Sequence, residues 1–152
     1  MTIMANANCG DNRGELRTLE LFIMSIEIQA VAAIGGFLLL LTLIQGTRNV
    51  LLLGLPVAAS NQHDIVPWDG ANDRLNRAIR NLIEAIAIFV PIAVAVQALG
   101  LTNETTALGA QIFLVSRVIH AIVFVAGIPW IRTTAWTGGV IGSVMVATPL
   151  LG

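Results

Sequence analysis

The chain alternates between long apolar stretches and short polar connections. Four stretches of mostly apolar residues occupy about residues 26–47, 73–99, 105–125 and 129–151. A helix needs about 20 mostly apolar residues to cross the hydrocarbon core of a bilayer, and each stretch is long enough to do so. The pattern therefore predicts an all-α fold, a four-helix transmembrane bundle with only short loops outside the membrane.

Residues that begin, bend or separate helices support this division. Asp73 is a good N-cap for the second stretch. Pro91 falls inside the same stretch, where neighbouring helices can absorb the kink that it causes. A Gly127-Ile128-Pro129 turn separates the third and fourth stretches. We therefore expect one helix for each stretch.

A polar segment precedes the first apolar stretch. It contains charged residues but no small-residue cleavage site, so we do not expect a removable signal peptide. Met24 would serve as a natural start of the chain. We divide the sequence into a polar tail at residues 1–25, expected to be disordered, and a transmembrane domain at residues 26–152.

Composition strengthens the membrane assignment. Apolar residues make up 56% of the chain and charged residues 11%, against about 25% charged in a typical soluble domain. All eight basic residues are arginine, and a guanidinium keeps its charge when partly desolvated. Several cations are therefore expected inside the protein. No basic patch with interleaved aromatics points to nucleic acid. The single cysteine, Cys9, leaves no disulfide or cysteine-based metal site within one chain, and we expect no metal.

The arginines are distributed unevenly between the loops. The connection at residues 100–104 carries none, whereas the third loop is marked by Arg132 and the first is flanked by Arg48, Arg74, Arg77 and Arg80. The positive-inside rule then makes the first and third loops cytoplasmic and places both termini outside, in a membrane that we take to be a bacterial inner membrane. Three tryptophans near the predicted boundaries are typical of interfacial anchors: Trp68, Trp130 and Trp136.

The second apolar stretch opens with a polar stripe. Arg77, Arg80, Asn81 and Glu84 are spaced i, i+3, i+4 and i+7, which places them on one helical face. Glu84 lies two turns into the membrane segment, where an unpaired carboxylate costs roughly 3 kcal/mol. We expect it to be the only buried acid near the arginines, and to need a cation or a proton.

The third stretch repeats this arrangement with Arg117, His120 and Phe124 at i, i+3 and i+7. If the two stripes face each other, Glu84 pairs with Arg117. One interpretation is that this pair only fixes the helix register, within one subunit or between subunits. The other is that it belongs to a functional site, because charges inside membranes are costly.

Surplus positive charge favours a site. More arginines than acids meet at the cytoplasmic ends of the predicted helices, and the arginine fork suits carboxylates and phosphates. The ligand could be an anionic lipid headgroup or a small dicarboxylate such as glutathione.

Three sequence motifs resemble those of the MAPEG family, the membrane-associated proteins of eicosanoid and glutathione metabolism. RAIRNLIE at residues 77–84 is similar to that family's second-helix signature. RVIHAIVF at residues 117–124, followed by GIP and Arg132, resembles its third helix and the start of its fourth. QGTR, which ends at Arg48, resembles the end of its first helix. The resemblance covers about residues 26–151.

The resemblance implies a homotrimer of four-helix subunits that binds glutathione between neighbouring subunits near the cytoplasmic side. Arg132 matches the arginine that stabilises the thiolate of glutathione in catalytic members, and Thr133 could donate a hydrogen bond to the same sulfur. Arg77 would lie at the edge of the glutathione site and Phe124 would pack against the ligand. By matching positions, the site would be lined by Arg48, Arg80, Asn81, Glu84, Arg117 and His120.

The chain also departs from the family. Family enzymes often have tyrosine at the positions of Phe124 and near Trp136, and this chain has no tyrosine. His120 fits a ligand contact or an interhelical hydrogen bond equally well. Two functions follow: a glutathione-dependent transferase or peroxidase acting on hydrophobic electrophiles or lipid hydroperoxides, or a non-catalytic protein that binds lipid or joins a larger membrane complex.

Overall fold

The computed structural model describes residues 25–59 and 70–152. Within these ranges the chain is all-helical, which confirms the prediction of an all-α fold. The elements are α2 (Ile26–Leu53), α3 (Leu55–Ala58), α4 (Gly70–Ala98), α5 (Glu104–Ala126), α6 (Pro129–Ala147) and the short 3₁₀ helix η2 (Thr148–Leu150). The predictions for residues 1–24, including Cys9 and Met24, and for Trp68 lie outside the described residues.

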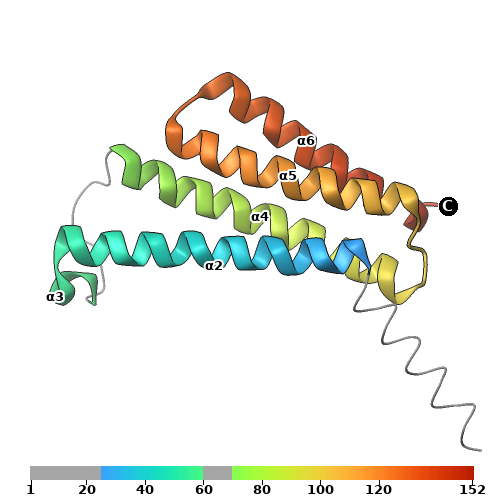
Figure 1. Cartoon of the computed structure of the whole chain (residues 1–152), viewed down its shortest axis with the longest axis horizontal. Helices are drawn as coiled ribbons and strands as arrows, with labels where there is room; N and C mark the ends of the chain where they lie inside the picture. The colour runs from blue at the N-terminus through green and yellow to red at the C-terminus, as the bar shows by residue number, and fades with distance from the viewer. Residues whose placement is uncertain (1–24, 60–69) are drawn as a thin grey trace, which may run out of the picture.

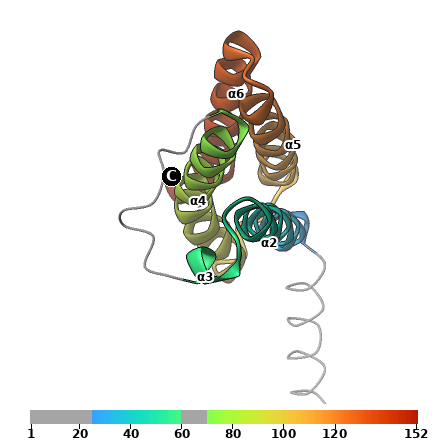
Figure 2. The same cartoon turned by 90° about the vertical axis from the view of Figure 1, so that its left-hand side faces the viewer.

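The four long helices run alternately up and down the long axis of the molecule (Figure 1). At one end of the bundle, α2 and α5 finish while α4 and α6 begin. We call it the arginine end, because the first turns of α4 and α6 carry Arg74, Arg77 and Arg132. Seen along the bundle, α2 and α6 lie farthest apart, with α4 and α5 between them (Figure 2). Successive helices therefore pack as antiparallel neighbours, and α5 with α6 forms the closest pair.

Local sequence explains where the helices start and stop. Asn103 caps α5: its side chain accepts hydrogen bonds from the backbone of Thr105 and Thr106, and the Thr106 hydroxyl accepts from the Asn103 backbone. Gly127 ends α5 at a φ of 80°, a conformation that favours glycine. Pro129 then opens α6, because a proline at the first helical position gives up no intrahelical hydrogen bond.

Two predicted boundaries differ from the structure. Asp73 is not an N-cap, because α4 already begins at Gly70. Asp73 instead lies in the first turn of α4, and its carboxylate pairs with Arg77 one turn on, at 2.9 Å. The first helix runs past residue 47 to Leu53, whereas α4 continues through Pro91 without a break. The polar residues near these ends thus lie inside helices rather than in loops.

The core is built from aromatic and small residues between neighbouring helices. The rings of Phe89 on α4 and Phe113 on α5 are fully buried and stack at 3.8 Å between centroids. Gly109 and Gly142 allow α5 and α6 to touch: a Cβ added at Gly142 would lie 2.6 Å from the Gly109 carbonyl oxygen. This backbone contact explains why α5 and α6 pack so closely.

In the described part of the chain, three helices are long and apolar enough to cross a membrane: α2, α4 and α5. The chain is therefore built as an integral membrane protein. The fourth predicted span, α6, has 19 residues but includes Arg132 and several threonines and glycines, which lower its hydropathy. It packs along α5 all the same (Figure 1).

A buried carboxyl group lies at the end opposite the arginines. Glu27 on α2 is 2% exposed and accepts a hydrogen bond from the hydroxyl of Thr106, which is itself fully buried at the start of α5. The expectation that Glu84 would be the buried acid is wrong for the single chain, because Glu84 is exposed on the surface of α4. Among the residues that the structure describes, the buried acid is Glu27.

Candidate functional site

Most of the positive charge gathers toward one end of the bundle. The described residues include six arginines, and five of them lie in the helical turns at or near the arginine end: Arg48, Arg74, Arg77, Arg80 and Arg132. Asp73 is the acid that lies beside these arginines. Its ion pair with Arg77 is the one ion pair that the described residues form. The arginine end therefore carries a surplus of positive charge.

Three of these arginines surround one cavity, which we call the arginine pocket. It has a volume of about 330 Å³ and lies between the start of α4 and the α5–α6 turn. Of the predicted site residues it brings together Arg77, Phe124 and Arg132. The remaining lining residues are Asp73, Arg74, Gly127, Ile128 and Pro129.

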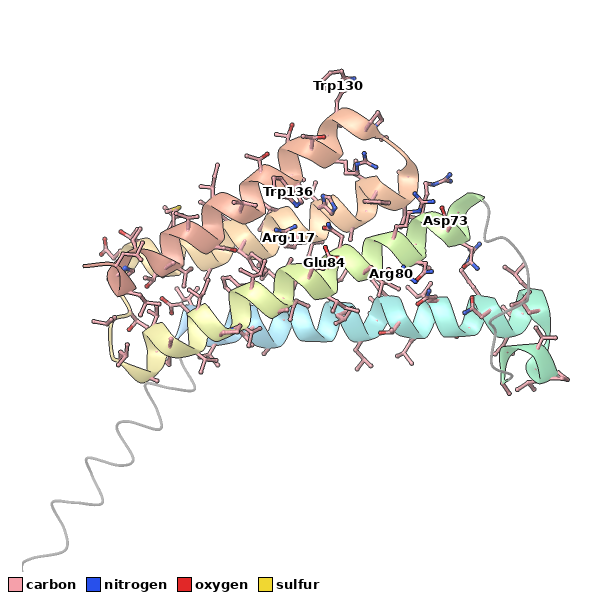
Figure 3. All side chains as sticks on the ribbon, turned by 180° about the vertical axis from the view of Figure 1, so that it is seen from behind. Asp73, Arg80, Glu84, Arg117, Trp130 and Trp136 are labelled. Atoms are coloured by element: carbon pink, nitrogen blue, oxygen red, sulfur yellow. The ribbon has the colours of Figure 1, made fainter. Side chains whose placement is uncertain are left out.

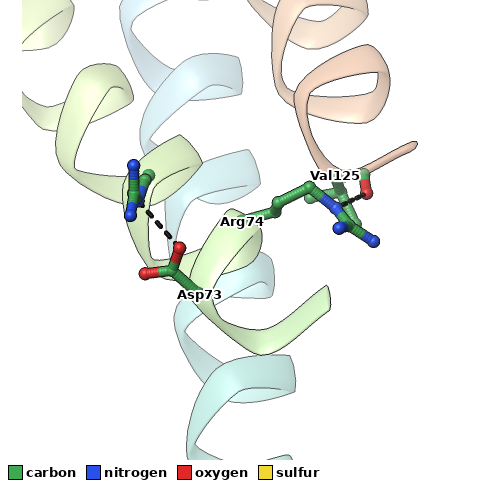
Figure 4. A network of polar contacts seen from close by, with 4 residues as sticks. Asp73, Arg74 and Val125 are labelled. Atoms are coloured by element: carbon green, nitrogen blue, oxygen red, sulfur yellow. Dashed lines mark hydrogen bonds and ion pairs between the residues drawn. The ribbon is translucent and has the colours of Figure 1, made fainter. Parts of the chain in front are cut away.

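Hydrogen bonds hold the α4 side of the arginine pocket in place. The Nε of Arg74 donates to the backbone carbonyl of Val125 at 2.8 Å, and the Asp73 carboxylate accepts from Arg77 (Figure 4). The first contact ties α4 to the last turn of α5. Arg74 was not predicted as a site residue, although it extends the polar stripe of α4 by one turn, three residues before Arg77. That spacing was the signal that could have found it.

Arg132 forms the α6 side of the pocket. Its guanidinium carbon lies 4.9 Å from the centroid of the Phe124 ring, within the range of a cation–π contact. Arg132 belongs to the first turns of α6, whose N-terminus has no side-chain cap. The uncapped N–H groups and the helix dipole add positive potential at the same place.

His120 supports this arrangement from α5. Its Nδ1 lies 3.1 Å from the backbone carbonyl oxygen of Arg132, and its ring meets Phe124 edge-on at 5.7 Å between centroids. Because a carbonyl oxygen can only accept, Nδ1 carries the hydrogen and donates it. The imidazole is 5% exposed, and its Nε2 finds no partner among the described residues. The sequence left two roles open for His120, a ligand contact or a hydrogen bond between helices. In the structure it makes the hydrogen bond between α5 and α6.

Arg117 lies deeper between α5 and α6 (Figure 3). It is 5% exposed, its guanidinium carbon is 5.6 Å from the Phe113 ring, and its Nε and Nη1 have no hydrogen-bond partner in the described part of the chain. A Cβ added at Gly139 would lie 2.5 Å from the Nε of Arg117. Gly139, which has no side chain, therefore leaves room for the Arg117 guanidinium. The expected pairing of Glu84 with Arg117 is not made within the chain.

The rest of the α4 stripe lies outside the arginine pocket. Arg80 and Glu84 are exposed, and neither lines the arginine pocket (Figure 3). Asn81 is half-buried, and its side-chain oxygen is buried without a partner among the described residues. None of these three residues shares the arginine pocket with Arg132.

Thr133 and Arg48 also lie away from the arginine pocket. Thr133 is exposed, and its hydroxyl donates a hydrogen bond to the backbone carbonyl of Pro129 at 3.3 Å. Arg48 lines a separate cavity between α2, α4 and α5. The structure therefore divides the predicted site residues between the arginine pocket, a separate cavity that holds Arg48, a buried layer between α5 and α6, and exposed positions.

Comparison with known proteins gives a match over nearly the whole chain. Residues 28–151 match the model of the MAPEG family. No curated protein matches the chain.

Proposed function

Because the chain belongs to the MAPEG family, whose members are membrane proteins of glutathione and eicosanoid metabolism, we propose that it is a glutathione-dependent transferase or peroxidase. Its substrates would be hydrophobic electrophiles or lipid hydroperoxides that enter from the bilayer. The observation that carries this proposal is the arginine pocket, which is lined by three arginines and one carboxylate.

The charge balance of the pocket suits an anionic ligand. Arg77 is already paired with Asp73, which leaves the charges of Arg74 and Arg132 without a carboxylate among the described residues. Arginine forks bind carboxylates with two parallel hydrogen bonds. Glutathione has two carboxylates and a thiol, so its chemistry fits a pocket with this surplus.

When bound, glutathione would supply a thiol as the nucleophile. The part of this chain is to favour the thiolate over the thiol, since the thiolate is the reactive form. Arg132 supplies a full positive charge, and the uncapped start of α6 adds the positive end of the helix dipole. The face of the Phe124 ring contacts the guanidinium of Arg132, and the imidazole of His120 donates a hydrogen bond to the backbone carbonyl of Arg132.

The outward face of α4 supports assembly into the homotrimer. Glu84 and Arg80 are exposed on a helix that is apolar enough to span the membrane, and an ionised group facing lipid is costly. A neighbouring subunit would cover both residues and complete a site between subunits. In that assembly Arg80, Asn81 and Glu84 of one subunit would contact glutathione held at the arginine end.

The same charges support an orientation. The arginine end is the cytoplasmic end under the positive-inside rule, and α6 would complete four spans by packing against α5. Both termini would then lie outside. Trp130 is 86% exposed beside the start of α6, as expected for an anchor at the membrane interface.

A second function is favoured by one feature of the chain. It has no tyrosine, and the hydroxyl of Thr133 is engaged by a backbone carbonyl. The neutral donors that would assist Arg132 at a thiolate are therefore reduced. A non-catalytic protein that keeps the fold and binds lipid, or serves as a subunit of a larger membrane complex, is the alternative.

Calorimetric titration of the purified protein with glutathione separates the two functions. The enzyme proposal predicts saturable binding that weakens when Arg132 is replaced by alanine. S-methylglutathione is the matched ligand, because it keeps both carboxylates but cannot form a thiolate, and it should bind more weakly. Absence of binding by either ligand would leave the non-catalytic function.

A further inference from the structure

A second cavity, which we call the α2–α5 groove, is separate from the arginine pocket. It has a volume of about 360 Å³ and shares no lining residue with the arginine pocket. Nine of its ten lining residues are apolar, and Arg48 is the exception. From α2 it is lined by Phe37, Leu40, Leu41 and Ile44.

The groove exists because α2 and α5 separate toward the arginine end. The hydrogen bond between Thr106 and Glu27 ties α5 to α2 at the opposite end, and the two helices diverge from there (Figures 1 and 2). Small residues widen the opening, because α4 contributes Ala71 and α5 contributes Ala121 to its walls. The space is therefore a consequence of how these helices pack.

Its length matches one leaflet of a bilayer. The α2 residues that line it run from Phe37 to Arg48, which at 1.5 Å per helical residue spans about 16 Å. Half of the hydrocarbon core is about 15 Å. With the arginine end at the membrane surface, a groove of this length would run from the middle of the membrane to the level of the headgroups, with Arg48 at the headgroup end.

The groove also opens sideways toward lipid. Leu40 on α2 and Ile122 on α5 are 52% and 59% exposed, so the rims of the groove are accessible to the surrounding bilayer. Arg48 is exposed and forms no ion pair with any carboxylate of the described residues. An apolar groove that ends at Arg48, a cation with no ion pair to the described residues, is complementary to a lipid chain that carries an anionic headgroup.

We propose that the α2–α5 groove binds an anionic phospholipid from the leaflet at the arginine end. One acyl chain lies along the groove between α2 and α5, the second remains in the bilayer, and the phosphate accepts hydrogen bonds from the Arg48 guanidinium. A volume of about 360 Å³ holds one chain rather than two, since it is near the lower limit of roughly 300–1,000 Å³ for small-molecule sites. The proposal concerns a different cavity from the arginine pocket, and it assigns Arg48, which the resemblance to the family placed in the glutathione site, to the phospholipid instead.

Native mass spectrometry of the purified protein with added lipid tests this site. The probes are dioleoyl phosphatidylglycerol and dioleoyl phosphatidylcholine, which share their acyl chains, and oleate, which has one chain and a carboxylate. We expect saturable binding of one phosphatidylglycerol per chain, about tenfold tighter than phosphatidylcholine, because charge-assisted hydrogen bonds exceed neutral ones. Equal binding of the two phospholipids would overturn the assignment of Arg48. Displacement of phosphatidylglycerol by an equal concentration of oleate would show a fatty-acid site instead.

Neighbouring leucines provide matched variants for the apolar part. Leu40 lines the groove and is 52% exposed, whereas Leu39 does not line it and is 60% exposed. Leu40→Trp should fill the groove and reduce phosphatidylglycerol binding severalfold, while Leu39→Trp should leave it unchanged. Equal effects of the two substitutions would contradict a chain in the groove.

A second pair of matched substitutions tests the headgroup end of the groove. Arg48→Gln should abolish the preference for phosphatidylglycerol, and Arg80→Gln, which makes the same charge change outside both cavities, should keep it. Loss of the preference in both variants would indicate general charge attraction and overturn the site. Efficient disulfide formation between copies that carry Leu40→Cys would show that a second copy of the chain covers the groove, and would also overturn it.

Discussion

The imidazole Nδ1 of His120 lies 3.1 Å from the backbone carbonyl oxygen of Arg132. The contact joins α5 to the first turns of α6, and the same imidazole packs edge-on against Phe124. Phe124 in turn lies under the guanidinium of Arg132. One histidine therefore positions both the backbone and the side-chain surroundings of the proposed thiolate-stabilising residue.

His120→Phe should weaken the proposed thiolate site without dismantling the fold. The substitution keeps a ring against Phe124 but removes the Nδ1–H donor, and such a hydrogen bond contributes about 1 kcal/mol. We expect slightly easier thermal unfolding and weaker glutathione binding. His120→Asn is the matched control, because its amide places a donor near the same position and should retain more binding. If both variants bind glutathione like the unaltered protein, His120 does not position Arg132.

Thr106→Val tests the buried contact at the opposite end. Valine keeps the shape of threonine but leaves the carboxyl group of Glu27 buried without this donor, and it also removes the hydroxyl that accepts from the Asn103 backbone at the cap of α5. An unsatisfied buried polar group costs about 1–3 kcal/mol, so the unfolding midpoint in detergent should fall. Thr106→Ser retains the hydroxyl and should lie much closer to the unaltered protein. Equal midpoints for the two variants would show that the hydrogen bond does not stabilise the fold.

Gly142→Ala should separate α5 from α6. Its Cβ would lie 2.6 Å from both the Gly109 carbonyl oxygen and the Phe113 nitrogen, and backbone atoms cannot move aside cheaply. Overpacking of this kind costs about 1–3 kcal/mol. Gly36→Ala is the control, because a Cβ on that helical glycine would meet nothing within 4 Å. Resistance to unfolding by denaturant should drop for Gly142→Ala alone, and equal losses would contradict the close contact of α5 with α6.

Glu84→Gln tests whether the outward face of α4 meets a neighbouring subunit. Glu84 has no ion-pair partner among the described residues, so in the proposed homotrimer its partner belongs to the adjacent subunit. We expect native mass spectrometry to show trimers for the unaltered protein and a smaller trimer fraction for Glu84→Gln. Glu104→Gln removes an exposed acid at the other end of the bundle and should leave assembly unchanged. Trimers of equal stability in all three proteins would show that Glu84 is not a subunit contact.

Periodicity and length predicted the helices well. Apolar stretches of membrane-spanning length identified α2, α4, α5 and α6, and the Gly-Ile-Pro turn located the start of α6 at Pro129. The polar spacing on α5 also placed Arg117 and His120 on one face, where both are buried. These features depend on residues close together in sequence, which a single chain reveals.

Contacts between distant segments could not be predicted in the same way. Burial of Glu27 depends on Thr106, 79 residues away, and the position of Arg48 depends on how far α2 diverges from α5. Helical spacing placed Glu84 on the arginine face of α4, but it does not determine which helix covers that face. The structure leaves that face uncovered in the single subunit, so the predicted pair with Arg117 does not form.

The most direct test of the proposed function is the ultraviolet absorbance of the thiolate when glutathione is added to purified protein near neutral pH. If Arg132 and the start of α6 favour the thiolate, the unaltered protein should show this absorbance at saturation. Arg132→Ala should lose most of it while keeping the same oligomeric state, and Thr133→Val should lose little, because that hydroxyl already donates to Pro129. Glutathione that binds without a thiolate signal, or a signal that survives Arg132→Ala, would contradict the assignment of Arg132 as the residue that activates the thiol.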